Sequence, residues 1–321
     1  MAKENQLSRY GALTRSLGVI SPGAKYHFVG LSTLSWYGDF LSEFGVDADG
    51  GNRVFPTLTA AIADSNVVAS RGDVIVILPG YTQTISSSTA LSISKAGLTI
   101  VGLGNGSLRP TFTLDTATTA TINITAANIE FQNCLFVANF ADIASCFTTT
   151  TAKNFTIRNC EFRDTSSVLN FNALVDTNTT SNDTDGLSIL DSNYYGLSAT
   201  SNSTVVKMDG TNTRLTIKNS YFAHAATTGA GLMPIATGKV VTNAVIENNR
   251  FNFVGATGLT VGTLITTDGS TNSGLLHNNI IFDLDATSEI LVTASSGFKF
   301  GINYSSAVAD KSGYIVPAQD A

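Results

Sequence analysis

The chain has few charged residues: Asp, Glu, Lys and Arg make up 13% of its 321 positions. Acidic residues outnumber basic ones, 24 against 18, so the net charge of −6 provides no basic surface for a nucleic-acid partner. No apolar run approaches the ~18 residues of a membrane-spanning helix, and we expect no membrane partner. Residues 1–23 lack the continuous apolar core of a signal peptide, so we expect a protein made without an export signal.

Side chains that bind metals are also scarce. The three histidines, His27, His224 and His277, lack metal-ligand spacing, and we expect no cofactor. The chain has three cysteines. Cys134 and Cys160 occupy the same place in a repeat described below, at a strand spacing of ~4.8 Å that a disulfide can bridge. We expect buried thiols instead, because Cys146 would remain unpaired and the cytosol is reducing.

A nine-residue pattern occurs six times between residues 128 and 281. Apolar residues stand at its second, fourth and ninth positions, Asn or Asp at its sixth, and a small residue usually follows. The sixth positions are Asn133, Asn159, Asp191, Asn219, Asn248 and Asn278, at intervals of 26, 32, 28, 29 and 30 residues. The alternation of apolar and polar residues indicates a strand, and Asn favours a bend with left-handed backbone. One strand and one bend per ~30 residues predicts a solenoid of β-coils.

Equivalent positions of such coils stack on one another. The fourth position then forms an inward column: Ile77, Ile100, Phe131, Ile157, Ile189, Ile217, Ile246 and Leu276. The ninth forms a mostly aromatic column: Phe136, Phe162, Tyr194, Phe222, Phe251 and Ile281. The sixth position predicts a structural ladder whose side chains bond each other and satisfy polar groups that would otherwise be buried. Segments 98–102 and 73–79 add two less regular coils, about eight in all.

The chain resembles the right-handed parallel β-helix family, the pectin-lyase-like superfold, over residues ~55–300. Its opening, Phe55–Ile62 followed by Gly72–Ile85, is similar to β-helix proteins common in bacteriophage genomes. The resemblance implies an all-β parallel β-helix whose first coil is covered by a short capping helix beginning after Thr57. The expected units are an N-terminal anchoring arm or cap (1–50), the β-helix (51–301) and a C-terminal cap or tail (302–321).

The first 50 residues are rich in aromatic side chains and do not fit the repeat. Apolar residues at 36, 37, 40, 41 and 44 predict a helix. This segment is expected to cover the apolar outward side of the first coil at Val74, Val76 and Leu78. It is also expected to bind a partner subunit, through Tyr10, Leu13, Leu17, Trp36, Tyr37, Phe40 and Phe44.

Enzymes of this superfold cleave polysaccharides, and glycoside hydrolysis needs two carboxylates ~5–10 Å apart. On the predicted outward strand face only Glu130 and Glu247 are acidic, four coils apart, and we expect ion pairs with Arg158 and Lys218. Less favoured carboxylate pairs are Glu161 with Asp164 and Asp283 with Asp285.

A polar excursion after residue 171 holds further carboxylates. Asp176, Asp183 and Asp185 could bind Ca²⁺, although a solvated loop is favoured. The cell-adhesion tripeptide Arg71-Gly72-Asp73 leads into a core strand, which disfavours adhesion.

The resemblance and the absence of paired carboxylates predict a protein that is not an enzyme. We expect a virion structural protein of a tailed phage, assembled in the host cytoplasm. The preferred form is a homotrimeric capsid decoration or cement protein that binds the major capsid protein or other virion proteins. The alternative is a tailspike or fibre that binds or cleaves host surface polysaccharide, including at a site between subunits.

Overall fold

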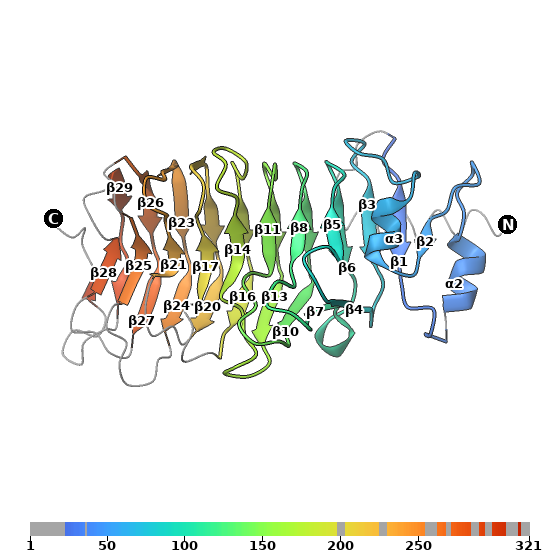
Figure 1. The fold of residues 1–321 in the computed structure, drawn as a ribbon, viewed down its shortest axis with the longest axis horizontal. Coiled ribbons are helices and arrows are strands. Elements are labelled where there is room, and N and C mark those ends of the chain that lie inside the picture. The colour runs from blue at the N-terminus through green and yellow to red at the C-terminus, as the bar shows by residue number, and fades with distance from the viewer. Residues whose placement is uncertain are drawn as a thin grey trace.

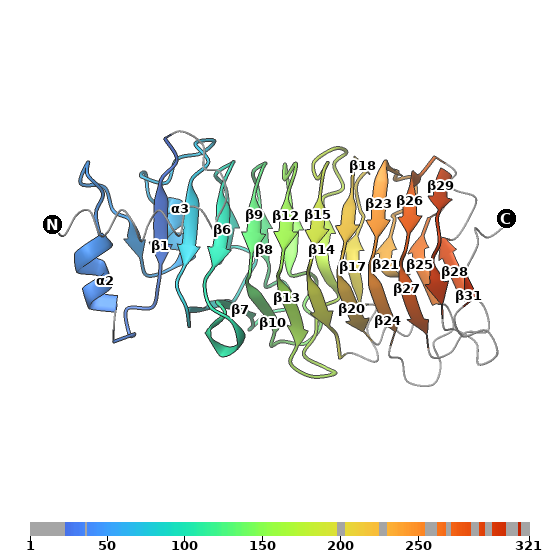
Figure 2. The same ribbon diagram turned by 180° about the vertical axis from the view of Figure 1, so that it is seen from behind.

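The computed structural model describes residues 23–35, 37–197, 203–224, 230–253, 262–267, 271–283, 289–292, 297–305 and 314–315. These residues form a right-handed parallel β-helix, in which each coil contributes strands to three sheets around one core (Figure 1). The coils stack along the long axis, with residues 37–44 at one end of the stack and residues 289–292 at the other (Figure 2). The predicted fold class is confirmed.

The first sheet has strand order β2 (Val54–Phe55), β1 (Tyr26–Val29), β3 (Val74–Ile77), β6 (Thr99–Gly102), β9 (Glu130–Gln132), β12 (Thr156–Arg158), β15 (Ser188–Leu190), β19 (Thr216–Lys218), β23 (Ala244–Glu247), β26 (Ser273–His277) and β29 (Gly297–Phe300). The second has β31 (Tyr314–Ile315), β30 (Tyr304–Ser305), β27 (Ile280–Asp283), β24 (Arg250–Phe253), β20 (Tyr221–His224), β16 (Asn193–Tyr195), β13 (Glu161–Asp164), β10 (Leu135–Ala138), β7 (Thr111–Leu114) and β4 (Thr82–Ile85). Within it, β31 pairs antiparallel with β30.

The third sheet has β17 (Thr204–Lys207), β14 (Ala173–Thr177), β11 (Phe147–Thr149), β8 (Ile122–Ile124) and β5 (Leu91–Ile93). Three strands, β21 (Ala230–Pro234), β25 (Gly262–Thr266) and β28 (Glu289–Val292), form a further sheet, and β21 lies beside β17. The short strands β18 (Asn212–Thr213) and β22 (Val241–Thr242) pair with each other, and a 3-10 turn, η1, spans Gly106–Leu108.

The inward columns are in register as predicted. From Ile100 to Leu276, successive fourth-position residues pair across the first sheet and are fully buried. Ile77 was placed in this column wrongly: Ile75 pairs with Ile100, and Ile77 pairs with Gly102. The ninth-position column is also in register, and its rings stack, for example Phe136 on Phe162 at 5.2 Å between centroids.

The bend residues adopt left-handed backbone, with φ between 49° and 58°. Their side chains bond in part to one another: Asn219 Nδ2 donates to Asp191 Oδ1 at 3.1 Å and Asn278 Nδ2 to Asn248 Oδ1 at 2.7 Å. Asn133 is half-buried and donates to the backbone oxygens of Gly102 and Gly104, at 2.8 and 3.0 Å, whereas the other bend residues are exposed.

The buried ladder lies one residue later, where the chain enters the second sheet. Its members are Cys134, Cys160, Ser192, Ser220, Asn249, Asn279 and Asn303. From Ser192 on, each side-chain oxygen accepts the backbone N–H of the equivalent residue in the preceding coil, at 3.0–3.2 Å. The three cysteines are buried thiols, as predicted.

The N-terminal segment extends the first sheet and covers it. Strand β1 pairs in parallel with both β2 and β3. Helix α2 (Tyr37–Phe44) packs Phe40 and Phe44 against Phe28, at 5.2 and 6.2 Å between centroids. Tyr26, Phe28, Tyr37, Val54, Val74, Val76, Leu78 and Val101 thereby form a second apolar cluster outside the solenoid core. The predicted cover of the first coil is confirmed.

Helix α3 (Leu58–Ala63) closes the end of the main core. Thr57 accepts the N–H of Ala60 at 3.0 Å, and Leu58, Ala61 and Ile62 are buried, as predicted. Of the predicted partner-binding residues, Tyr37 is buried and Phe40 and Phe44 are half-buried, whereas Tyr10, Leu13, Leu17 and Trp36 lie outside the described residues. In the described part of the chain, no helix has the length and apolar character to cross a membrane.

Candidate functional site

Two carboxylates on the outward side of the first sheet form the predicted ion pairs. Arg158 Nε lies 2.8 Å from Glu130 Oε1, and Lys218 Nζ lies 2.9 Å from Glu247 Oε2. The hydrogen bond from Lys218 lowers the pKa of Glu247. Each carboxylate is thus paired with a cation rather than with a second carboxylate.

Glu161 and Asp164 do not face each other. Glu161 points outward from β13 and pairs with Arg109, at 3.0 Å, and with Arg163. Asp164 points inward and accepts the N–H groups of Phe171 and Leu197, at 3.0 and 2.8 Å. The other carboxylate pair is not tested, because Asp285 and the side chain of Asp283 lie outside the described residues.

The three aspartates proposed for Ca²⁺ are engaged separately. Asp183 accepts a bond from Asn178, Asp185 accepts the N–H of Thr213, and Asp176 pairs with Lys207. Within the described ranges, no group of three His, Cys, Asp or Glu side chains is arranged to hold a metal ion.

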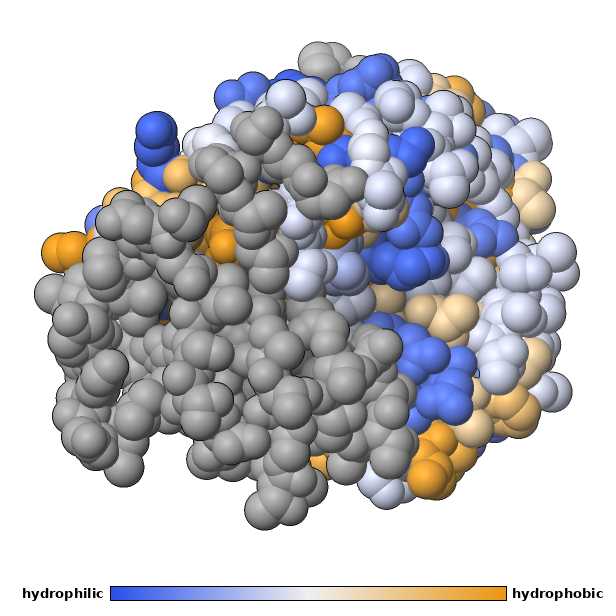
Figure 3. Space-filling view, turned by 60° about the vertical axis from the view of Figure 1, so that its left-hand side comes forward, coloured by the Kyte–Doolittle hydropathy of each residue, from blue (hydrophilic) through white to orange (hydrophobic). Residues whose placement is uncertain are grey.

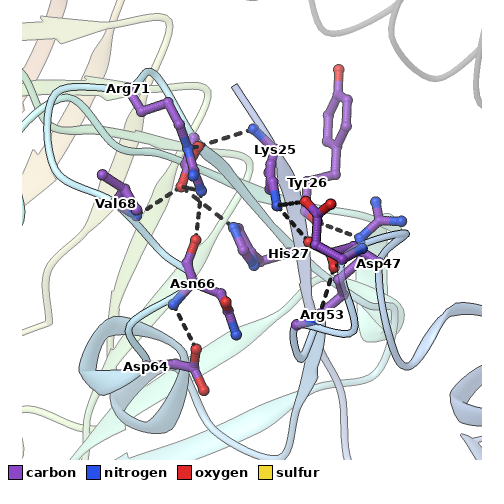
Figure 4. A network of polar contacts seen from close by, with 12 residues as sticks. Lys25, Tyr26, His27, Asp47, Arg53, Asp64, Asn66, Val68 and Arg71 are labelled. Carbon is purple, nitrogen blue, oxygen red and sulfur yellow. Dashed lines mark hydrogen bonds and ion pairs between the residues drawn. The ribbon is translucent and has the colours of Figure 1, made fainter. Parts of the chain in front are cut away.

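Asp73 of the adhesion tripeptide is fully buried and joins the N-terminal strand to the first coil. Figure 4 labels its partners Lys25, His27, Val68 and Arg71. Asp73 accepts the N–H groups of Lys25 and Val68, both at 2.9 Å, and two bonds from Arg71 at 2.6 Å. His27 Nε2 lies 3.4 Å from Asp73 Oδ2. Burial alone raises the pKa of Asp73, but these contacts outweigh it and hold the pKa well below its usual range. A carboxylate held this way serves structure, not adhesion.

One carboxylate pair was missed in the sequence. Asp176 on β14 and Asp209 both contact Lys207 of β17, with Nζ–Oδ2 distances of 3.2 and 2.6 Å. Burial raises the pKa of Asp176, although Lys207 opposes the shift. A carboxyl group with a raised pKa beside a second carboxylate is the arrangement of a general acid and its base. The sequence named Asp176 only as a Ca²⁺ candidate, because Asp209 lies 33 residues further along the chain and only the pairing of β14 with β17 brings the two together.

The outward side of the second sheet carries aromatic and polar side chains together, at positions eight and ten of the repeat. We call it the aromatic face, consisting of Asn193, Tyr195, Tyr221, Arg250, Asn252, Phe282 and Tyr304. Tyr195 and Tyr304 are 42% and 38% exposed. These residues come from β16, β20, β24, β27 and β30, so they follow the long axis (Figure 1).

Neighbouring side chains on the aromatic face fix one another. The rings of Tyr195 and Tyr221 lie 5.7 Å apart, and Asn252 Nδ2 donates to the Tyr221 hydroxyl at 3.2 Å. The guanidinium of Arg250 lies over the Phe282 ring, 5.8 Å from its centroid. Flat rings are therefore presented beside hydrogen-bonding groups.

The outward sides of the other sheets differ. Among the described strands from β6 to β29 of the first sheet, the outward side chains are Thr, Ser, ion pairs, a few aliphatic groups, and Gln132, His277 and Lys299. On the third sheet they are small or polar: Ser92, Asn123, Thr148, Asp176 and Lys207. Figure 3 shows one side of the molecule, with a patch of strongly hydrophilic residues and hydrophobic ones in small groups.

No protein-family model matches the sequence, and no curated protein matches it. A solved structure described as a rhamnogalacturonan lyase is similar to this chain, with a TM-score of 0.47, 12% sequence identity and a match covering 87% of each chain. The expectation that this protein is not an enzyme is corrected, because this structural neighbour is named as a lyase. The likeness concerns the parallel β-helix alone and assigns no activity to this chain.

Proposed function

We propose that the protein binds a polysaccharide along the aromatic face of its β-helix. The carrying observation is that four of five successive strands of the second sheet present an outward ring, Tyr195, Tyr221, Phe282 and Tyr304, among the polar side chains of Asn193, Arg250 and Asn252. Aromatic side chains offer apolar surface to the C–H faces of sugar rings, while polar neighbours bond sugar hydroxyls. The β-helix fold is consistent with a polysaccharide-binding or structural protein.

The spacing of the rings fits a linear ligand parallel to the long axis. Tyr195 and Tyr304 are four strands apart in the second sheet, a distance of ~19 Å at ~4.8 Å per strand. One coil is comparable in length to one sugar unit, so successive units meet successive coils. Stacked strands hold these positions rigidly, and little conformational entropy is lost on binding.

Binding of polysaccharides by Tyr195→Ala and Tyr221→Ala, measured by calorimetry, tests this function. Losing one stacked ring should weaken binding about tenfold, equivalent to ~1.4 kcal/mol. Thr156→Ala, on the outward side of the first sheet, is the matched control and should bind like wild type. Tyrosine variants that bind as tightly as the control would refute the proposal.

Glycoside cleavage is a second candidate function, favoured by the geometry that brings Asp176 and Asp209 to the same Lys207 Nζ, at 3.2 and 2.6 Å, and by the burial that raises the pKa of Asp176. Asp176 would protonate the leaving oxygen while Asp209 activates the attacking water. The measurement is release of reducing ends from host surface polysaccharide. Asp176→Asn should abolish release and Asp191→Asn, at an exposed bend, should not. Equal release by wild type and Asp176→Asn would exclude this role.

The virion assignment and the homotrimer remain hypotheses. The observation that favours side-by-side association is an apolar patch on the first sheet, where Val245 pairs with Leu275 and Leu275 is 39% exposed. A light-scattering mass of three chains that falls to one chain in Leu275→Glu would support the trimer. Absence of the protein from purified particles would exclude decoration of a capsid.

A further inference from the structure

We propose that the polysaccharide is anionic and that Arg163 and Arg250 bind its acidic groups. This inference rests on the proposed function and adds the chemical class of the ligand. It follows from the distribution of charge on the second sheet, from the geometry of the two arginines and from their separation along the stack.

The outward side of the second sheet carries a charge opposite in sign to the net charge of the whole chain. The chain carries a formal net charge of −6. On the outward side of the described second-sheet strands, Arg163 and Arg250 are basic and Glu161 is the one acidic residue, with Arg109 beside it. Three cations against one carboxylate leave this side positive. A positive stripe on an acidic protein attracts anions and repels them elsewhere.

Both arginines remain available to a ligand. Arg163 is 54% exposed although it contacts Glu161, whose other oxygen is bound by Arg109. Arg250 is exposed, and its guanidinium carbon lies over the Phe282 ring, 5.8 Å from the centroid. A contact with a ring face uses none of the guanidinium N–H groups, and these match a carboxylate with two parallel hydrogen bonds.

The two arginines bracket the tyrosine pair. Arg163 lies on β13 and Arg250 on β24, three strands further along the second sheet, which is ~14 Å at ~4.8 Å per strand. Tyr195 and Tyr221 come from the two strands between them. A chain that stacks sugar rings on the tyrosines therefore meets a cation at each end of that stretch. This arrangement fits acidic sugars that recur along a linear chain.

The test compares acidic polysaccharides with uncharged forms of the same chains. Alginate, hyaluronate, polygalacturonate and polyglucuronate are each titrated beside their carboxyl methyl esters, at low and high salt. We expect at least one acid form to bind tenfold or more tightly than its ester, and the difference to shrink with salt. Arg250→Gln and Arg163→Gln should each lose about tenfold for the acid form and little for the ester. Arg158→Gln, on the first sheet, should change neither.

The outcomes separate the two proposals. Esters that bind as tightly as the acid forms, with no effect of the arginine variants, would overturn the anionic ligand and leave polysaccharide binding standing. No binding of any polymer would count against both. A single-stranded oligonucleotide that binds the aromatic face as tightly as the best acid form would also overturn the inference, because rings and arginines serve nucleic acids too.

Discussion

Replacing Asn279 by Ala should destabilise the β-helix far more than any change at its exposed neighbour. Asn279 is fully buried and joins three coils. Its Oδ1 accepts the N–H and the Nδ2 of Asn249, at 3.1 and 3.0 Å. Its Nδ2 donates to Ile246 O and to Asn303 Oδ1, both at 2.9 Å. Alanine removes all four bonds and supplies none.

The magnitude follows from the groups left behind. The backbone N–H of Asn249 loses its acceptor inside the core, and so does one N–H of the Asn249 side-chain amide. An unsatisfied buried polar group costs ~1–3 kcal/mol, so two such groups lower the free energy of unfolding by about 2–6 kcal/mol. Asn279→Ser should cost less, because Ser192 and Ser220 already accept the equivalent N–H with their hydroxyls.

Urea unfolding, followed by far-ultraviolet circular dichroism, measures these differences. The control is Asn278→Ala, which removes one exposed side-chain bond and an asparagine from left-handed backbone at φ 53°. We expect that variant to lose about 1 kcal/mol. The order of stability should be wild type, Asn278→Ala, Asn279→Ser and then Asn279→Ala. If Asn279→Ala is no less stable than Asn278→Ala, the buried ladder does not stabilise the stack.

Three further predictions concern the core and the N-terminal junction. Phe136→Ala should lower the free energy of unfolding by about 3–5 kcal/mol, because the ring packs between Phe112 and Phe162; Val137→Ala, which points outward from β10, should change urea unfolding much less. Asp73 has a depressed pKa, so its ionised form stabilises the fold above the unfolded-state pKa of about 4, and this contribution is lost as the pH falls below that value. The Asp73→Asn variant should therefore have a lower free energy of unfolding at pH 7 and lose less of it in acid. An acid profile equal to that of the wild type would contradict this. Burial raises the thiol pKa of Cys134 and Cys146 well above its usual value, so Ellman's reagent should label the cysteines only after unfolding; rapid labelling of the native protein would show that this part of the core opens.

The inward columns could be predicted from the sequence because burial repeats in every coil. Phe131, Ile157 and Ile189 each had to be apolar, and a nearly constant interval made the column visible in one chain.

The register of the first coil was harder to predict. Val74 and Val76 are as apolar as Ile75 and Ile77, since both sides of β3 are covered, and no alternation fixed the register. The buried ladder was missed for another reason. Its positions hold Cys, Ser or Asn, so no single residue type repeats along the sequence. Only the hydrogen bonds between coils reveal the common role of these side chains.

The aromatic face was missed because the outward columns were examined on one strand per coil. Tyr194 is buried and completes the core, whereas Asn193 and Tyr195 on either side of it point outward. The pattern fixes position nine, and in a strand this fixes the direction of positions eight and ten as well. Those positions need not be apolar, so they can differ from coil to coil without disturbing the core. Tyr, Arg and Asn appear there in the later coils, while Thr111 and Leu135 occupy the same column in the earlier ones. A β-helix can therefore change the ligand it binds one coil at a time, and the C-terminal half of the second sheet is where this chain departs from a purely structural pattern.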